Sequence, residues 1–300
     1  MVAELLICRN LKGFASVIVS IRHLGQDMLR DLLVHIDGNE AGRRRLQLSI
    51  GLARGAGARL TGLHVTPPPD VEPLYKPSQL DQAVANLART LAEDACCAET
   101  IFADETAMGP IDARWFAAEG DIVQGIGHRA RYADLVILGQ HDRQGPHVSH
   151  PLPIAHSVVV HCGRPVLVVP ANVGPCQFAR IGIAWDGGRE AVRAVHDALP
   201  LLGLAGSVEI ITINPSPAAQ QAEDTNQLRE HLARYGVISL EPVAIETGDE
   251  AAALREQTEK ASYDLLVMGG YSHPMWLEFI FGGTTKSVLR SSKIPVLVSH

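Results

Sequence analysis

The chain has 300 residues, of which 46% are hydrophobic and 20% charged, and its formal net charge is -7. This composition is typical of one large or two medium globular domains, and the acidic balance argues against a nucleic-acid-binding surface, which needs clustered Lys and Arg. No apolar run approaches the roughly 20 residues that span a bilayer. The five cysteines include no CxxC pair, so we expect them to be reduced and mostly packed, as in a cytoplasmic protein.

Residues 1–29 are interpreted as an N-terminal extension. Its apolar run, Phe14–Ile21, is short, is followed by Arg22 and precedes no convincing small-residue cleavage site, so we do not expect a signal peptide. Residues 1–27 also lack a counterpart in the repeat described next. The extension is either an accessory segment or a stretch that precedes a true translation start at Met28, and we favour the second interpretation.

Short β-branched runs recur along the chain and indicate buried parallel strands. In chain order they are residues 32–38, 60–65, 134–139 and 165–168, and then residues 181–187, 208–213, 264–269 and 295–298. Asp134 and Asp264 are 130 residues apart, as are Pro165 and Pro295. The shared offset indicates that the sequence contains two copies of one structural unit.

Helical patterns lie between these strands. Residues 40–54 form one, and we interpret the basic run Arg43–Arg45 inside it as a solvent-exposed face. Residues 189–199 form another, with Val192 and Val195 on the apolar face, and Pro200 is expected to end it. Asp121 and Asp249 are predicted N-caps, and Gly57 a C-cap.

Alternating strands and helices predict βαβ units with right-handed crossovers. The fold class is therefore α/β, with two tandem doubly wound parallel-sheet domains. We assign residues 30–170 to the first domain and residues 177–300 to the second, joined by the Pro- and Gly-containing residues 170–175.

Two glycine steps mark the second half. Gly269-Gly270-Tyr271-Ser272 follows an apolar strand, and Gly282-Gly283-Thr284-Thr285 precedes the next helical pattern. Glycines let a backbone approach an anion, and the first N–H groups of a helix have no intrahelical partners, so the pair predicts a phosphate cradle. It is not a P-loop, which needs glycine where Thr285 and Ile280 stand.

This repeated order resembles the universal stress protein family, whose signature is Gly, two residues, Gly, nine residues, then Gly and Ser or Thr. The resemblance covers nearly everything from about residue 30 onward. It implies an adenine nucleotide alpha hydrolase-like fold that binds ATP or AMP, or that acts without nucleotide where the site is lost. It also implies pairing through the fifth strands, either within the chain or in a homodimer.

The resemblance assigns site residues in the second half. Asp186 and Ile213 would flank the adenosine end, whereas Thr284 and Thr285 would supply the hydroxyl that Gly283 lacks. The remaining predicted positions lie in the two glycine steps and the loop between them: Gly269, Gly270, Tyr271, Ser272, His273 and Gly282.

The first half carries an altered copy of the site. Gly139 remains, but Asp142 replaces the second glycine and Pro153 stands near the final step, where it removes an N–H donor. Asp37 and Val65 are the matching adenosine positions. We therefore expect the first half to act as a packing partner.

The resulting hypothesis is a cytoplasmic stress-response protein that binds adenine nucleotide in its second half and acts through conformational or partner effects. One alternative is a nucleotide-independent interaction module with both sites degenerate, and another is a slow ATPase. No catalytic residue is assigned, although His273 and Asp186 are the candidates nearest the expected phosphates. The five histidines from His141 to His161 match no metal motif, so no metal is expected. The acidic charge and the lack of a bilayer-length apolar run argue in turn against a nucleic-acid or membrane partner.

Overall fold

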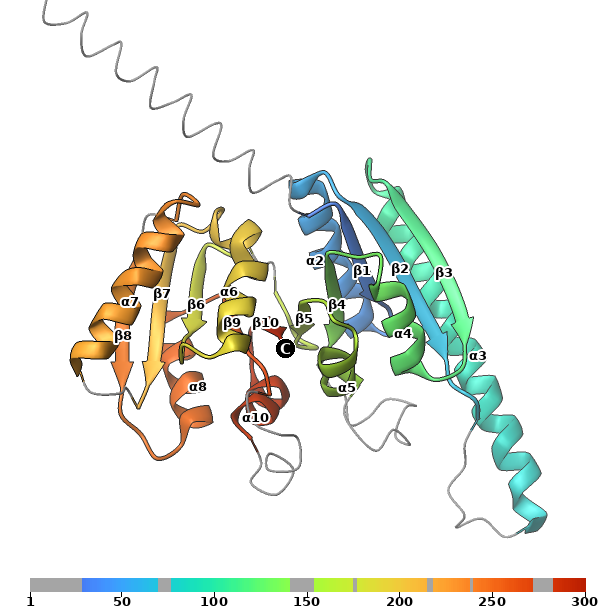
Figure 1. The fold of residues 1–300 in the computed structure, drawn as a ribbon. Helices are drawn as coiled ribbons and strands as arrows, with labels where there is room; N and C mark the ends of the chain where they lie inside the picture. The colour runs from blue at the N-terminus through green and yellow to red at the C-terminus, as the bar shows by residue number, and fades with distance from the viewer. Residues whose placement is uncertain are drawn as a thin grey trace, which may run out of the picture.

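The computed structural model describes residues 29–69, 77–140, 154–174, 177–214, 218–237, 240–271 and 283–300. In these residues ten strands form one continuous sheet, in the order β3-β2-β1-β4-β5-β10-β9-β6-β7-β8, with helices on both faces (Figure 1).

Both halves of the chain repeat the same succession of elements. The first half consists of β1 (Asp31–His35), α2 (Glu40–Ala56), β2 (Arg59–Thr66), α3 (Pro77–Ala107), β3 (Ala113–Glu119), α4 (Ile122–Ala130), β4 (Leu135–Gly139), α5 (Ile154–His161) and β5 (Val166–Val169). The second half consists of β6 (Arg180–Ala184), α6 (Arg189–Leu202), β7 (Ser207–Ile213), α7 (Ala218–Ala233), β8 (Leu240–Ile245), α8 (Glu250–Ala261), β9 (Leu265–Gly269), α10 (Thr284–Ser291) and β10 (Val296–Ser299).

Strand pairing is parallel inside each half and antiparallel between the halves. β1 pairs with β2 and β4, and β6 pairs in the same way with β7 and β9. β5 and β10 then pair antiparallel, with Leu167 opposite Leu297. The predicted intrachain pairing through the fifth strands is therefore confirmed, and it removes two edges that would otherwise be open to other strands.

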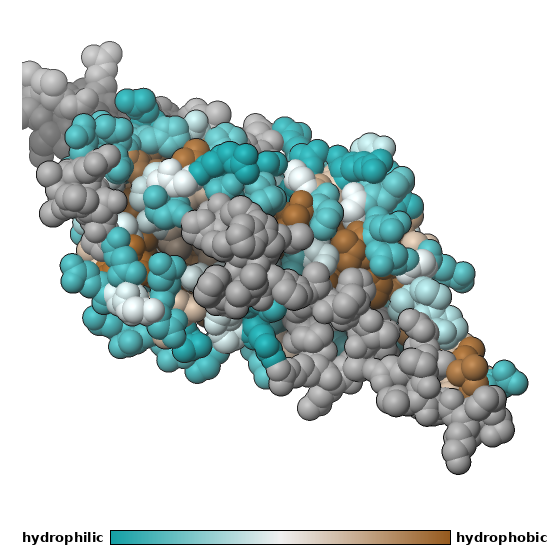
Figure 2. Space-filling view, turned by 60° about the horizontal axis from the view of Figure 1, so that its bottom comes forward, coloured by the Kyte–Doolittle hydropathy of each residue, from teal (hydrophilic) through white to brown (hydrophobic). Residues whose placement is uncertain are grey.

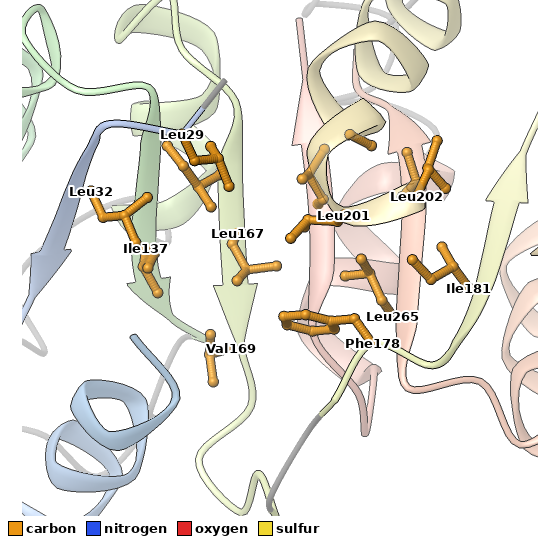
Figure 3. Close-up of a cluster of buried hydrophobic side chains, with 14 of the residues drawn as sticks. Leu29, Leu32, Ile137, Leu167, Val169, Phe178, Ile181, Leu201, Leu202 and Leu265 are labelled. Atoms are coloured by element: carbon orange, nitrogen blue, oxygen red, sulfur yellow. The ribbon is translucent and has the colours of Figure 1, made fainter. Parts of the chain in front are cut away.

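The core consists of two apolar layers, one on each face of the sheet. Side chains of α2, α3, α6 and α7 pack on one face, and those of α4, α5, α8 and α10 pack on the other. The first layer runs across the seam between the halves, where Leu167 and Val169 lie opposite Phe178 and Leu265 (Figure 3). The second layer also contains residues of both halves, such as Val166 and Val298, so the two halves share a core and fold against each other.

The predicted helix ends agree with the structure at three positions. The side chain of Asp121 accepts a hydrogen bond from the Gln124 N–H, and the side chain of Asp249 accepts one from the Ala252 N–H. Gly57 ends α2 in the left-handed conformation, with φ of 65°. These caps satisfy N–H and C=O groups that have no partner inside the helix.

Other local expectations were wrong. α6 continues through Pro200 to Leu202, because Pro200 stands in the last turn and Leu201 and Leu202 are buried. Val192 is 52% exposed and does not lie on the packed face. Cys162 is buried as expected, whereas two other cysteines are exposed on α3: Cys96 and Cys97.

The run Arg43–Arg45 is not a uniformly solvated face. Arg45 is only 3% exposed, since helical periodicity places it on the buried stripe with Leu46 and Ser49. This buried arginine distinguishes the first half from the second.

Candidate functional site

The candidate site lies at the carboxyl ends of the strands in the second half. β6 and β9 are neighbours, but the helices that follow them cover opposite faces, so the chain diverges between these two strands. Open α/β sheets bind ligands at such points. Asp186 follows β6, Ile213 ends β7 and Gly269 ends β9, so the fold brings these three predicted residues to one edge.

The arrows of the outer strands in Figure 1, such as β2, β3, β7 and β8, point toward the face that Figure 2 turns forward. On the described part of this face, hydrophilic side chains cover most of the surface, and the apolar areas are small. Broad apolar patches mark protein or membrane contacts, and the visible described surface shows none.

The turn after β6 is closed by Asp186. Its Oδ1 accepts a hydrogen bond of 2.8 Å from the Gly188 N–H, and Gly187 adopts a φ of 73° that favours glycine. The carboxylate of Asp186 remains exposed. Ile213 is half-buried against the apolar layer of α8 and α10.

The glycines after β9 permit two close approaches. A β-carbon on Gly269 would lie 2.5 Å from the backbone nitrogen of Ala191, and one on Gly270 would lie 2.6 Å from Val298 Cγ1. Both distances are shorter than real contacts, so these positions are needed for packing α6 and β10 against the turn. That requirement exists whether or not a phosphate binds nearby.

Tyr271 is buried rather than spread over the open edge. Its backbone φ is 62°, unusual for a residue with a β-carbon, and its N–H donates to Thr285 Oγ1 at 3.4 Å. The ring contacts His156 and His300 edge-on, with centroids 5.5 and 6.2 Å away. Within the described residues, the Tyr271 hydroxyl makes no hydrogen bond.

The start of α10 holds the predicted hydroxyls. Gly283 is the N-cap and makes no side-chain cap bond, and Thr284 Oγ1 donates to Glu250 Oε2 at 2.9 Å. Thr285 is buried and accepts from Tyr271 as described above. Thr284 therefore already donates its hydroxyl proton to a protein group, whereas Thr285 is engaged only as an acceptor. The remaining predicted positions lie outside the described residues: Ser272, His273 and Gly282.

Sequence reasoning missed a carboxylate beside this site. Glu190, in the first turn of α6, is 7% exposed, and Arg189 pairs with it at 2.8 Å. Burial raises the pKa of the Glu190 carboxyl, but hydrogen bonds from its own backbone N–H and from Arg189 outweigh burial and hold the pKa below its usual value. Its position at a helix start was the available signal, because acidic residues are stabilised there.

The corresponding edge of the first half is filled by Arg45. The guanidinium donates through Nε to the His35 carbonyl at 2.7 Å and through Nη2 to Asp37 Oδ2 at 2.5 Å. A β-carbon on Gly139 would collide with Nη1 of the same side chain. Arg45 thus lies across the ends of β1 and β4, where this half would receive a ligand.

The second half has a small residue at the equivalent position. Arg45 is the sixth residue of α2, and Ala194 is the sixth residue of α6. In the first half, Val65 stands at the position that matches Ile213, and it is only 1% exposed. The two halves therefore share a backbone plan but differ in what occupies their carboxyl edges.

A separate cleft of 700 Å³ lies between the halves, on the side of α2 and the end of α6. Leu48, Val173 and Leu204 are among its lining residues. It contains none of the positions expected to bind nucleotide. Across the described residues, no helix combines the length and apolar character needed to cross a membrane.

Comparisons with known proteins agree with the fold. The model of the universal stress protein family matches residues 28–170 and again residues 177–300. A universal stress protein from Archaeoglobus fulgidus DSM 4304 is 19% identical, with a TM-score of 0.63 over 90% of this chain and 95% of that chain. A protein of the same family name from Pseudomonas aeruginosa UCBPP-PA14 is 20% identical, with a TM-score of 0.57 over 92% of this chain and 94% of that chain.

At these identities the two structures support the fold alone. No curated protein matches the chain. The two family matches nevertheless cover most of its length, and the repeated strand order follows the same division. The chain therefore belongs to the universal stress protein family, as a tandem two-domain member.

Proposed function

We propose that this protein is a stress-response protein that binds one adenine nucleotide, ATP or AMP, in its second half and acts through conformational or partner effects. The observation that carries the proposal is the difference between Arg45 and Ala194. The first half uses its own guanidinium to satisfy Asp37, whereas Asp186 in the second half remains exposed. Only the second half therefore keeps its predicted adenosine carboxylate available.

The charges suggest how the nucleotide lies. Asp186 and Ile213 flank the adenosine end in this proposal, and Gly269–Tyr271 with Gly283–Thr285 flank the phosphates. The ionised Glu190 would repel phosphate from the start of α6. The first turn of α10 offers phosphate its N–H groups, since helix N-termini favour anions, provided that the Glu250 carboxylate gives up Thr284 Oγ1.

Phosphate binding would have to rearrange local hydrogen bonds. The hydroxyl of Thr284 donates to Glu250, which begins α8. A phosphate that takes this hydroxyl competes with the Glu250 carboxylate and separates α10 from α8. This change would alter the surface that α10 and α8 present. A partner protein could then distinguish the nucleotide-bound state from the nucleotide-free state.

One observation favours the interaction module as a second candidate. The hydroxyls of Thr284 and Thr285 are engaged by protein groups, and Gly269 and Gly270 have packing reasons to be glycine. A protein that had lost nucleotide binding would keep all of these features. ATP hydrolysis has no comparable support, because the nearby carboxylates already have protein partners: Asp186 closes its own turn, Glu190 pairs with Arg189 and Glu250 accepts from Thr284.

Calorimetry with ATP and with AMP distinguishes the two candidates. The proposal predicts binding with one site per chain, and Asp186→Ala should weaken it by at least tenfold, as expected when a charged hydrogen-bonding partner is lost. Asp104→Ala is the matched control, since Asp104 is exposed on α3 in the other half. If titration of the wild-type protein with ATP and with AMP produces no heat of binding, the proposal fails and the nucleotide-independent interaction module is the remaining candidate.

A further inference from the structure

The glycine turn of each half contacts the other half across the β5–β10 seam. Gly139 ends β4 and leads into Gln140, and Gly269 ends β9 and leads into Gly270, so the two turns occupy equivalent places. α5 and α10 lie on the same face of the sheet, one on each side of the seam (Figure 1).

The first contact runs from the first half to the end of α10. The side-chain amide of Gln140 donates to the carbonyl of Leu289 at 2.9 Å and to the carbonyl of Ser292 at 3.0 Å. Carbonyls in the last turn of a helix have no intrahelical partners. A first-half side chain therefore caps a second-half helix.

The second contact joins the turn after β9 to α5. The Tyr271 ring packs edge-on against His156, which is 8% exposed. Val159, one turn further along α5, lies close enough to contact a β-carbon placed on Gly270, at 3.7 Å. The left-handed backbone of Tyr271 needs such support, since surrounding contacts must hold a residue in this conformation.

Tyr271 links this second contact to the start of α10. Its N–H donates to Thr285 Oγ1, and the carbonyl of Gly270 lies 3.0 Å from Nδ1 of His300. α10 is consequently held at its first turn through Tyr271 and at its last turn through Gln140. Both contacts depend on the first half, because Tyr271 packs against His156 and Gln140 itself belongs to that half.

We propose that Gln140 and His156 are positioning residues for the nucleotide site of the second half. This inference rests on the proposed function, because α10 carries the N–H groups and hydroxyls assigned to the phosphates. Neither side chain is assigned to the ligand. The first half thus contributes to binding through α10 and Tyr271, although its own carboxyl edge is filled by Arg45.

The test compares two variants with two matched controls. His156→Ala and Gln140→Ala remove the seam contacts. His161→Ala changes an exposed histidine of α5 whose ring lies against the Ser157 carbonyl, and Gln124→Ala changes an exposed glutamine of α4. Circular dichroism establishes that each protein is folded at 25 °C before the measurements.

Two readouts are taken from the folded proteins. Hydrogen exchange of residues 284–292 is measured without ligand, and the Kd for ATP or AMP is measured by calorimetry. We expect faster exchange in both seam variants and a Kd raised about 3- to 30-fold with unchanged stoichiometry, the range typical of coupling through intermediate residues. The controls should stay within twofold of wild type.

The outcomes separate this inference from the proposed function. If hydrogen exchange of residues 284–292 is the same in the seam variants as in wild type, Gln140 and His156 do not position α10. If exchange is faster but the Kd for nucleotide is unchanged, their positioning of α10 has no consequence for binding. If the wild-type protein binds neither nucleotide, the proposed function fails, and the exchange data alone decide whether the first half positions α10.

Discussion

The guanidinium of Arg45 lies against the carboxylate of Asp37, with Nη2 and Oδ2 2.5 Å apart. The arginine is 3% exposed, and its Nε also donates to the His35 carbonyl. An arginine fork can serve two acceptors at once, which an ammonium group cannot do with the same geometry. One side chain therefore closes the carboxyl edge of the first half.

Arg45→Ala should lower the free energy of unfolding by about 3 kcal/mol, because it leaves a partly buried carboxylate without its cation. Arg45→Lys should recover part of this loss, since it keeps the charge but not the fork. Urea titration measures both effects. Arg44→Ala is the control, and we expect less than about 1 kcal/mol for it because Arg44 pairs at the surface. Equal losses for Arg44 and Arg45 would contradict the assigned role.

Glu190→Gln should remove a pH-dependent part of the stability. The folded pKa of Glu190 lies below the unfolded value of 4.5, so its stabilisation is fully present above pH 4.5 and is lost as the pH falls through the folded pKa. We expect the variant to be about 1–2 kcal/mol less stable at pH 7. The difference from wild type should disappear in acid.

Urea titrations at several pH values measure this difference. Glu256→Gln, at an exposed position of α8, is the control and should show no such trend. A gap between wild type and Glu190→Gln that is as large at pH 3 as at pH 7 would count against an ionised Glu190.

The two buried tyrosines of the second half should respond differently to loss of the hydroxyl. The Tyr263 hydroxyl donates to Glu209 at 2.5 Å and accepts from Gln257 at 3.2 Å, and burial together with the Glu209 hydrogen bond raises the pKa of Tyr263. Tyr263→Phe should cost about 1–3 kcal/mol. Tyr271→Phe should be neutral or stabilising, because its hydroxyl is buried and finds no hydrogen-bond partner among the described residues. Thermal unfolding of both variants measures the contrast, and the reverse order would refute it.

Gly269→Ala should destabilise the second half by about 1–3 kcal/mol, since the new methyl group would collide with the α6 backbone. Gly248→Ala is the control, because in the described part of the chain no heavy atom beyond its two chain neighbours lies within 4 Å of its β-carbon position, and its φ is not positive. Urea titration compares the two variants. A tolerated Gly269→Ala would show that α6 and β9 have room to separate.

Much of the fold was predictable from the sequence for physical reasons. Apolar β-branched runs identify buried strands, and the 130-residue offset between Asp134 and Asp264 reveals the repeat. The arrangement of side chains at the carboxyl ends of the strands was harder to predict from the sequence. Arginine is normally solvated, so a buried Arg45 could be recognised only by placing it on the helical stripe with Leu46.

The contacts across the seam were inaccessible for another reason. Tyr271 and His156 are separated by more than a hundred residues, and no local pattern specifies which faces of α5 and the glycine turn will meet. Glycine spacing was also ambiguous, because Gly269 and Gly270 satisfy both a packing requirement and a phosphate-binding signature.

In the proposed function, nucleotide binds in the second half and not in the first. Photolabelling with 8-azidoadenosine triphosphate, followed by peptide mapping, distinguishes the two halves. We predict labelling, reduced by excess ATP, in peptides that contain Asp186 or Ile213. Labelling of the equivalent first-half peptides around Asp37 and Val65, or no labelling that ATP suppresses, would contradict the claim.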